Sequence, residues 1–172
     1  PMLEKAKMLA RSEEVENIGF ACVDVQVESL GDVVFDAAFS RFGVMFFEDP
    51  MEAFSNIHNA LSMAGALSFV CWQSPAVNPW HALSMEVVTE YIDIPKPPPR
   101  SPSPFAFQER DYVEEILVNA GFRNIEIQSL EKKIVWFNGK DSNCAASSYL
   151  SINPITSEGL AQLDDEGKQN IQ

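Results

Sequence analysis

The sequence is poor in the residues that bind metals or build disulfide frameworks. It has three cysteines and two histidines. Cys22, Cys71 and Cys144 lack a CxxC partner, and His58 and His81 are not in an HExxH arrangement. An odd number of cysteines in a chain of 172 residues is typical of free thiols in a reducing compartment. The sequence therefore predicts a cytoplasmic protein with no structural metal.

Basic residues are also scarce. Lysine and arginine number 12 against 25 aspartates and glutamates, which gives a net charge of −13 and a pI of about 4.4. Nucleic-acid phosphates would repel such an acidic chain, so we exclude nucleic-acid binding as its main function. No apolar run approaches the roughly 20 residues of a membrane-spanning helix. Apolar residues nevertheless make up 46% of the chain, which is enough for the core of one globular domain.

Strong catalytic motifs are missing as well. The sequence contains no GxSxG nucleophile elbow, no GxGxxG loop and no P-loop. The catalytic residues are therefore unknown from the sequence, and any site must be inferred from the places where predicted strands end.

The first half of the chain alternates strand and helix patterns. Residues 1–10 begin with proline and carry an apolar stripe, which predicts a helix. Three apolar runs predict strands buried on both faces: Phe20–Val23, Val33–Phe39 and Ala66–Trp72. Asp49 as N-cap and Pro50 as first helical residue predict a helix between the last two strands that stops at Gly65. A strand, a helix and a strand with short connections predict an α/β fold with a parallel sheet.

The second half has a different pattern. A helix is expected over His81–Ile92, and residues 95–104 are a proline-rich stretch that predicts an extended loop. Another helix runs through Val113–Ala120 and stops at Gly121. Two further strands are predicted as an antiparallel pair, around Ile125–Ile127 and Ile134–Phe137. Residues 140–172 read as a C-terminal helical segment.

Candidate ligand-binding residues follow from the ends of the predicted strands. Ligands of open α/β sheets bind outside the carboxyl ends of the strands, where Asp24–Val25, Ser40–Phe42 and Trp72 are expected. The Asp24 carboxylate either accepts a hydrogen bond from a ligand or caps the next turn. Arg41 either contacts a ligand or pairs with Asp36 or Glu48, and we favour the ion pair.

One stretch of the chain resembles a known family. Residues 35–50, FDAAFSRFGVMFFEDP, are similar to the fourth-strand segment of class I S-adenosylmethionine-dependent methyltransferases, nearest to the ubiquinone/menaquinone C-methyltransferase branch. Weaker similarity continues through Asn78–Trp80, Phe105–Phe107 and Ala120–Phe122, so that it covers nearly the whole chain. The resemblance implies a partial Rossmann-like sheet, made of family strands 3 to 7 with the last pair antiparallel and helices on both faces.

The resemblance also implies a reaction and a set of binding residues. The chain would transfer a methyl group from S-adenosyl-L-methionine to a small-molecule acceptor, without a metal. Its implied cofactor-binding residues are Met2 and Asp24 at the adenine, the Val25 amide facing the ring, and Ser40, Arg41 and Phe42 beneath the methionine part. An acceptor pocket would be shaped by Trp72, Asn78, Trp80, Phe105 and Phe107, although core packing explains large aromatic residues more often than ligand contact does.

The sequence departs from the family in one respect. The family's first two strands and glycine-rich loop have no counterpart in it, so residues 1–172 are expected to form an incomplete domain whose missing part lies before Pro1. The strands over 20–25 and 34–39 should then pair directly or leave the first one loose. Cofactor affinity should be poor, and exposed sheet edges should favour self-association.

The main alternative to a methyltransferase is a non-catalytic interaction module or inactive fragment. A nicotinamide-dependent oxidoreductase fits the SRFGVMFF segment and the antiparallel ending less well.

Overall fold

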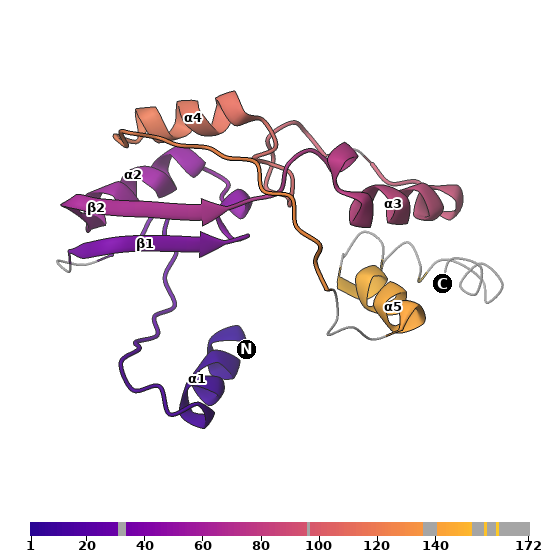
Figure 1. Cartoon of the computed structure of the whole chain (residues 1–172), viewed down its shortest axis with the longest axis horizontal. Helices are drawn as coiled ribbons and strands as arrows, with labels where there is room; N and C mark the ends of the chain where they lie inside the picture. The colour runs from indigo at the N-terminus through magenta and orange to yellow at the C-terminus, as the bar shows by residue number, and fades with distance from the viewer. Residues whose placement is uncertain (31–33, 96, 136–140, 153–156, 158–160, 162–172) are drawn as a thin grey trace.

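A computed structural model describes residues 1–30, 34–95, 97–135, 141–152, 157 and 161 of the chain. Its helices and strands follow one another as shown in Figure 1: α1 (Met2–Ser12), β1 (Phe35–Arg41), α2 (Pro50–Ala60), β2 (Leu61–Val70), α3 (Pro79–Tyr91), α4 (Arg110–Asn119) and α5 (Ser142–Ile152). Two short 3₁₀ turns, η1 (Val44–Phe46) and η2 (Pro75–Val77), follow the two strands.

The centre of the fold is the predicted strand–helix–strand unit. β1 and β2 pair in parallel, with Ala37 opposite Ala66 and Arg41 opposite Val70. At the start of α2 the Asp49 side chain accepts a hydrogen bond from the Glu52 amide at 3.1 Å, and Pro50 is the first helical residue. The sequence patterns for the parallel sheet and for the N-cap are thus confirmed.

The predicted end of α2 is wrong by several residues. The helix ends at Ala60 instead of Gly65, and β2 begins immediately with Leu61. Leu61 pairs with Phe35 at the start of β1, so pairing with a neighbouring strand overrides the helical pattern over residues 61–65.

The predicted sheet is larger than the one found. The described residues form one two-stranded sheet, and Phe20–Val23 has no strand structure. Residues 122–135 contain no strand either, while Trp136 and Phe137 lie outside the described residues. Ile125 and Ile127 pack against the core as extended chain instead of pairing. A strand requires a partner for its backbone groups, and no partner lies beside these segments in the described structure.

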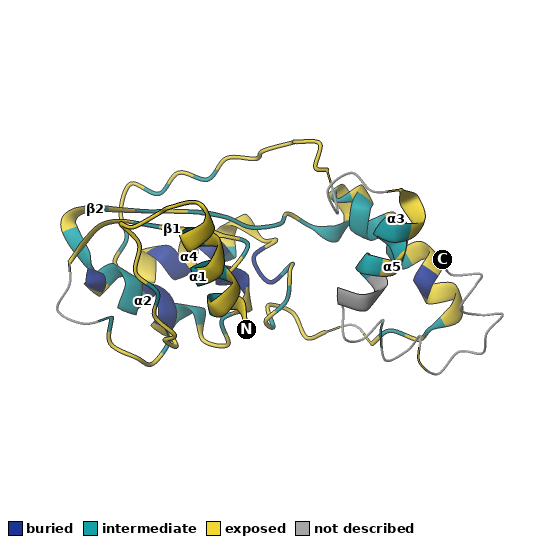
Figure 2. Cartoon of the chain, turned by 90° about the horizontal axis from the view of Figure 1, so that it is seen from below, coloured by how far each residue is buried: buried dark blue, intermediate teal, exposed yellow. Residues whose placement is uncertain are grey.

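Helices cover one face of the sheet. α2 packs against both β2 and α4 on this face, and Figure 2 shows buried residues on both helices. The core contains Val44, Met45, Phe54, Ala106, Phe107, Val113, Ile116, Leu117 and Ala120. α1 lies apart from the sheet, and none of its residues is buried (Figure 1). The expectation of helices packed on both faces is therefore wrong for the described residues.

The helices predicted in the second half are found among the described residues, unlike the two strands. α3 lies within one or two residues of its predicted range, and the stretch before residue 104 is an irregular loop. α4 ends just before Gly121, whose φ of +99° explains why glycine stands there. α5 begins the C-terminal helical segment and packs on α3 through Tyr149.

Candidate functional site

The candidate site begins where β1 ends. Phe42 directly follows β1, and its amide donates to the Val70 carbonyl of β2 at 3.0 Å. Its φ of +57° lies in the left-handed region, which a bulky residue rarely adopts. In this backbone conformation the Phe42 ring stacks on the Trp72 ring, with their centroids 4.3 Å apart and their planes 14° from parallel. The ends of the two parallel strands thus present a pair of stacked rings, and backbone strain of this kind is often found at functional sites.

Further aromatic side chains extend this pair from the sheet toward α3 and α5. The Trp72 ring lies 4.9 Å from Trp80 on α3, and Trp80 lies 6.0 Å from Phe105 in the loop before α4. His81 lies 4.6 Å from Phe105, and Tyr149 of α5 lies 6.2 Å from Trp80. We call this set the aromatic cluster: Phe42, Trp72, Trp80, His81, Phe105 and Tyr149. The structure therefore brings together four residues that the sequence had proposed for binding, Phe42, Trp72, Trp80 and Phe105.

Asn78 positions one ring of the aromatic cluster. Its side-chain amide donates to the carbonyls of Gln73 and Ser74 at 3.1 and 3.0 Å. Its Oδ1 accepts from the indole N–H of Trp80 at 3.2 Å. Asn78 thus ties the loop after β2 to the first turn of α3 and fixes how Trp80 presents its face.

Phe107 lies elsewhere. It is 5% exposed and contacts Phe54 and Phe69 in the main core, with ring centroids 5.9 and 6.4 Å apart. Its place in the structure agrees with core packing, the alternative that the sequence left open.

Asp24 and Val25 lie in a turn that is bound to α2. The Asp24 carboxylate accepts from the Gln26 amide at 3.0 Å, which is the turn-capping role that the sequence left open. The Asn56 side-chain amide donates to the carbonyls of Val25 and Glu28 at 2.8 and 2.7 Å. Met2, the third residue expected near the adenine, lies on α1 and is 88% exposed. The described contacts of these three residues are thus separate from the aromatic cluster.

Arg41 has no ion pair within the described part of the chain. Neither Asp36 nor Glu48 pairs with it, and Asp36 instead accepts from the Ser62 hydroxyl at 3.3 Å. The guanidinium at the carboxyl end of β1 is therefore left without the carboxylate partner that the sequence favoured. This arrangement suits an anionic group of a ligand.

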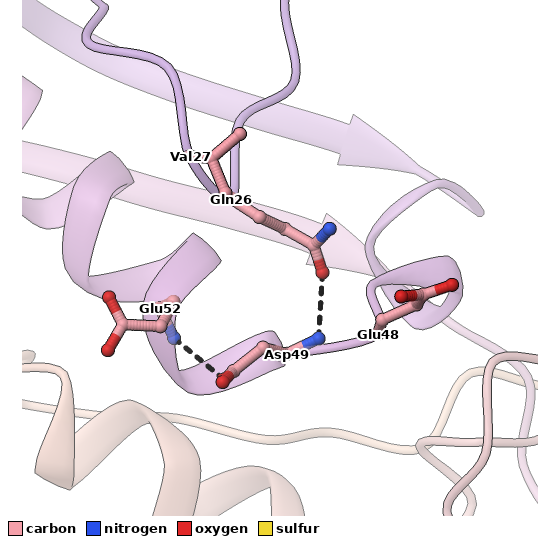
Figure 3. Close-up of a pocket in the computed structure, with 5 residues that line it drawn as sticks. All are labelled: Gln26, Val27, Glu48, Asp49 and Glu52. Carbon is pink, nitrogen blue, oxygen red and sulfur yellow. Dashed lines mark hydrogen bonds between the residues drawn. The ribbon is translucent and has the colours of Figure 1, made fainter.

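An acidic hollow lies at the start of α2. It has a volume of about 550 Å³ and is lined by Gln26, Val27, Glu48, Asp49 and Glu52 (Figure 3). The Gln26 side chain accepts from the Asp49 amide at 2.7 Å, so two of the lining residues already bind each other. No group of three metal-binding side chains occurs among the described residues, and this hollow gives no sign of a metal site.

His81 and Tyr149 form a polar contact that the sequence did not indicate. The His81 Nδ1 and the Tyr149 hydroxyl lie 3.1 Å apart, across 68 residues of chain. Burial lowers the pKa of His81 below its usual 6.5 and raises the pKa of Tyr149 above its usual 10.0. Both groups are therefore neutral near pH 7, and the Tyr149 hydroxyl can donate to Nδ1.

The His81 environment predicts how stability depends on pH. Because the unfolded chain binds a proton at His81 more readily than the folded chain, the free energy of unfolding should fall as the pH drops below 6.5. Urea unfolding measured between about pH 5 and pH 8 tests this. His81→Asn, which does not titrate in this range, should flatten the dependence. An equal slope in both proteins would assign the pH dependence to other groups.

The N-terminal 69 of the 172 residues match a family model. Residues 1–69 match the family model described as a methyltransferase domain. The match includes β1, α2 and nearly all of β2, and thus the strand ends that carry Ser40, Arg41 and Phe42. It supports a methyltransferase-like function and is consistent with a partial methyltransferase fold.

Other comparisons add no relative. No curated protein and no solved structure gave a significant match to the chain. Within the described residues, no helix combines the length and apolar character needed to cross a membrane.

Proposed function

We propose that this chain is part of a class I S-adenosylmethionine-dependent methyltransferase that methylates a small-molecule acceptor, as in the ubiquinone/menaquinone C-methyltransferase branch. The observation that carries the proposal is the methyltransferase-domain match over residues 1–69, which includes β1 and nearly all of β2, the two strands that Phe42 and Trp72 follow. The cytoplasm is the proposed location, and no metal takes part.

The residues at the strand ends have the chemistry that this cofactor requires. The faces of Phe42 and Trp72 suit a sulfonium cation, because aromatic faces attract positive charge. Arg41, which has no ion pair in the described structure, suits the carboxylate of the methionine part. When bound, the cofactor supplies an activated methyl group, so the protein has to position the acceptor and exclude water.

The proposed roles divide along the chain. Ser40, Arg41 and Phe42 hold the methionine part, while Met2, Asp24 and the Val25 amide contribute on the adenine side. The acceptor lies against the aromatic cluster, where Trp72, Trp80 and Phe105 present their rings and Asn78 holds Trp80 in place. Phe107 supports this region from the core and has no direct contact with the acceptor.

Binding of S-adenosylhomocysteine to this chain tests the proposal. We expect weak, millimolar-range binding, because the sequence has no glycine-rich loop to donate further hydrogen bonds to the cofactor. Amide NMR signals of Ser40, Arg41 and Phe42 should shift as the ligand is added. Phe42→Ala should weaken binding by roughly threefold to tenfold, the usual contribution of one aromatic contact.

Phe46→Ala is the matched control, because Phe46 lies in η1 close by in sequence and its side chain is 52% exposed. It should leave the affinity unchanged. If the signals of Ser40–Phe42 stay in place at millimolar S-adenosylhomocysteine, the cofactor assignment is wrong and a non-catalytic interaction module becomes the better explanation.

A further inference from the structure

Arg100 has a backbone conformation that arginine disfavours. Its φ is +63°, in the left-handed region that residues other than glycine and asparagine rarely adopt. It lies in the proline-rich loop over residues 97–104, between α3 and α4, and is exposed. A strained backbone of this kind persists only where the surrounding contacts hold it, and it is often found at functional sites. The contacts of Arg100 therefore show what this loop is held for.

Two contacts hold the Arg100 side chain against α4. The guanidinium pairs with the Glu109 carboxylate, with Nη2 and Oε2 2.8 Å apart. Its central carbon also lies 4.1 Å from the centroid of the Tyr112 ring, whose face attracts a cation. Glu109 is the N-cap of α4 and Tyr112 belongs to its first turn. Arg100 thus fastens the loop to the beginning of this helix.

The residues between Arg100 and Phe105 form a stiff connection. They read Ser101-Pro102-Ser103-Pro104, so that every second residue is proline. The proline ring fixes φ at about −65°, and the residue before each proline is restricted as well. Little backbone freedom remains over residues 101–104. A displacement of the loop at Arg100 is therefore carried on to Phe105 instead of being absorbed between them.

Phe105 contacts α3 within the aromatic cluster. Its ring centroid lies 4.6 Å from that of His81 and 6.0 Å from that of Trp80. The loop is also tied to η1, because the Ser103 amide donates to the Met45 carbonyl at 3.3 Å. With Arg100 fastened to α4 and Ser103 to η1, the loop presents the Phe105 ring to α3.

We propose that Arg100 is a positioning residue for the acceptor side of the site, since it closes the proline-rich loop onto α4 and thereby sets where Phe105 stands in the aromatic cluster. The assignment of Phe105 to the methyl acceptor rests on the proposed function, whereas the position of its ring does not. None of the described contacts of Arg100 reaches the cluster, so it acts through the loop. An ion pair between exposed side chains contributes little to overall stability, so its effect falls on the loop.

Proton NMR of the two histidines of the chain, His58 and His81, tests this positioning. The Phe105 ring lies close enough to His81 to displace its Hε1 resonance by ring current. Arg100→Asn removes both contacts with α4, while asparagine still tolerates a left-handed backbone. The His81 resonance of this variant should move most of the way toward that of free histidine, as it should in Phe105→Leu. The His58 resonance should stay in place.

Two further variants serve as controls. Arg123→Asn removes the same charge from an exposed arginine without an ion pair in the described structure, and it should leave both histidine resonances unchanged. Arg100→Lys keeps the charge but not the planar guanidinium, so it should move the His81 resonance less than Arg100→Asn does.

The proposal is overturned if the His81 resonance of Arg100→Asn equals that of the wild type. Equal movement of both histidine resonances would overturn it too, because it would indicate a general loosening of the fold. S-adenosylhomocysteine should shift the amide signals of Ser40–Phe42 equally in Arg100→Asn and in the wild type. Absence of these shifts from both proteins would contradict the proposed function and leave the role of Arg100 to the histidine resonances.

Discussion

Phe54→Ala should lower the free energy of unfolding by about 3 to 5 kcal/mol, the largest effect that we expect of any single substitution here. The Phe54 side chain is fully buried on α2, and its ring lies 5.5 Å from Phe69 of β2 and 5.9 Å from Phe107. Removing the ring leaves a cavity where α2, the sheet and the loop before α4 meet. Because small domains are stable by only about 5 to 15 kcal/mol, this loss is a large share of the total stability.

Urea unfolding followed by circular dichroism measures this loss. Phe46→Ala serves as the control, since the same side chain is deleted from a site that is 52% exposed. Its effect should stay below about 1 kcal/mol. Similar losses in the two variants would show that Phe54 is not the centre of the core.

Gly121→Ala should destabilise the fold by about 1 to 3 kcal/mol. Gly121 ends α4 with a φ of +99°, and its amide donates to the Val118 carbonyl at 3.1 Å. A methyl group at this position would lie 3.1 Å from the His58 ring, which itself packs edge-on against Phe122 at 5.0 Å. The substitution thus combines backbone strain with a displaced ring at the contact between α2 and α4.

Thermal unfolding compares this variant with Gly19→Ala. Gly19 has open space around it and no left-handed backbone, so its substitution tests the loss of a glycine alone. We expect that variant to be as stable as the wild type or slightly more stable, because alanine restricts the unfolded chain. Equal destabilisation at the two positions would show that the positive φ of Gly121 and its contact with the His58 ring are not the cause.

Local sequence signals predicted the parts of the fold that depend on local interactions. The N-cap at Asp49 and the stop at Gly121 are each decided by a few neighbouring residues. The strand expected at Phe20–Val23 depends instead on a distant partner, and an apolar run without a neighbour does not become a strand. The end of α2 was misjudged for a related reason, since Leu61 pairs with a residue 26 positions earlier.

The candidate site was predictable only where its residues follow strands. Phe42 and Trp72 end two adjacent parallel strands, so the sequence could place them side by side. The left-handed backbone of Phe42 has no sequence signal, because phenylalanine gives no preference for it. His81 and Tyr149 meet through the packing of α3 on α5, which no local pattern indicates.

The attachment of residues 24–28 to α2 decides how the chain responds to a pulling force. Both hydrogens of the Asn56 amide are used, one for the Val25 carbonyl and one for that of Glu28. Tension applied at Pro1 would reach α2 at Asn56 before it reaches β1, ten residues beyond Val25. Motion of α1 and of the segment after it is thus separated from the parallel strands by the Asn56 hydrogen bonds and by the one that Gln26 accepts from the Asp49 amide.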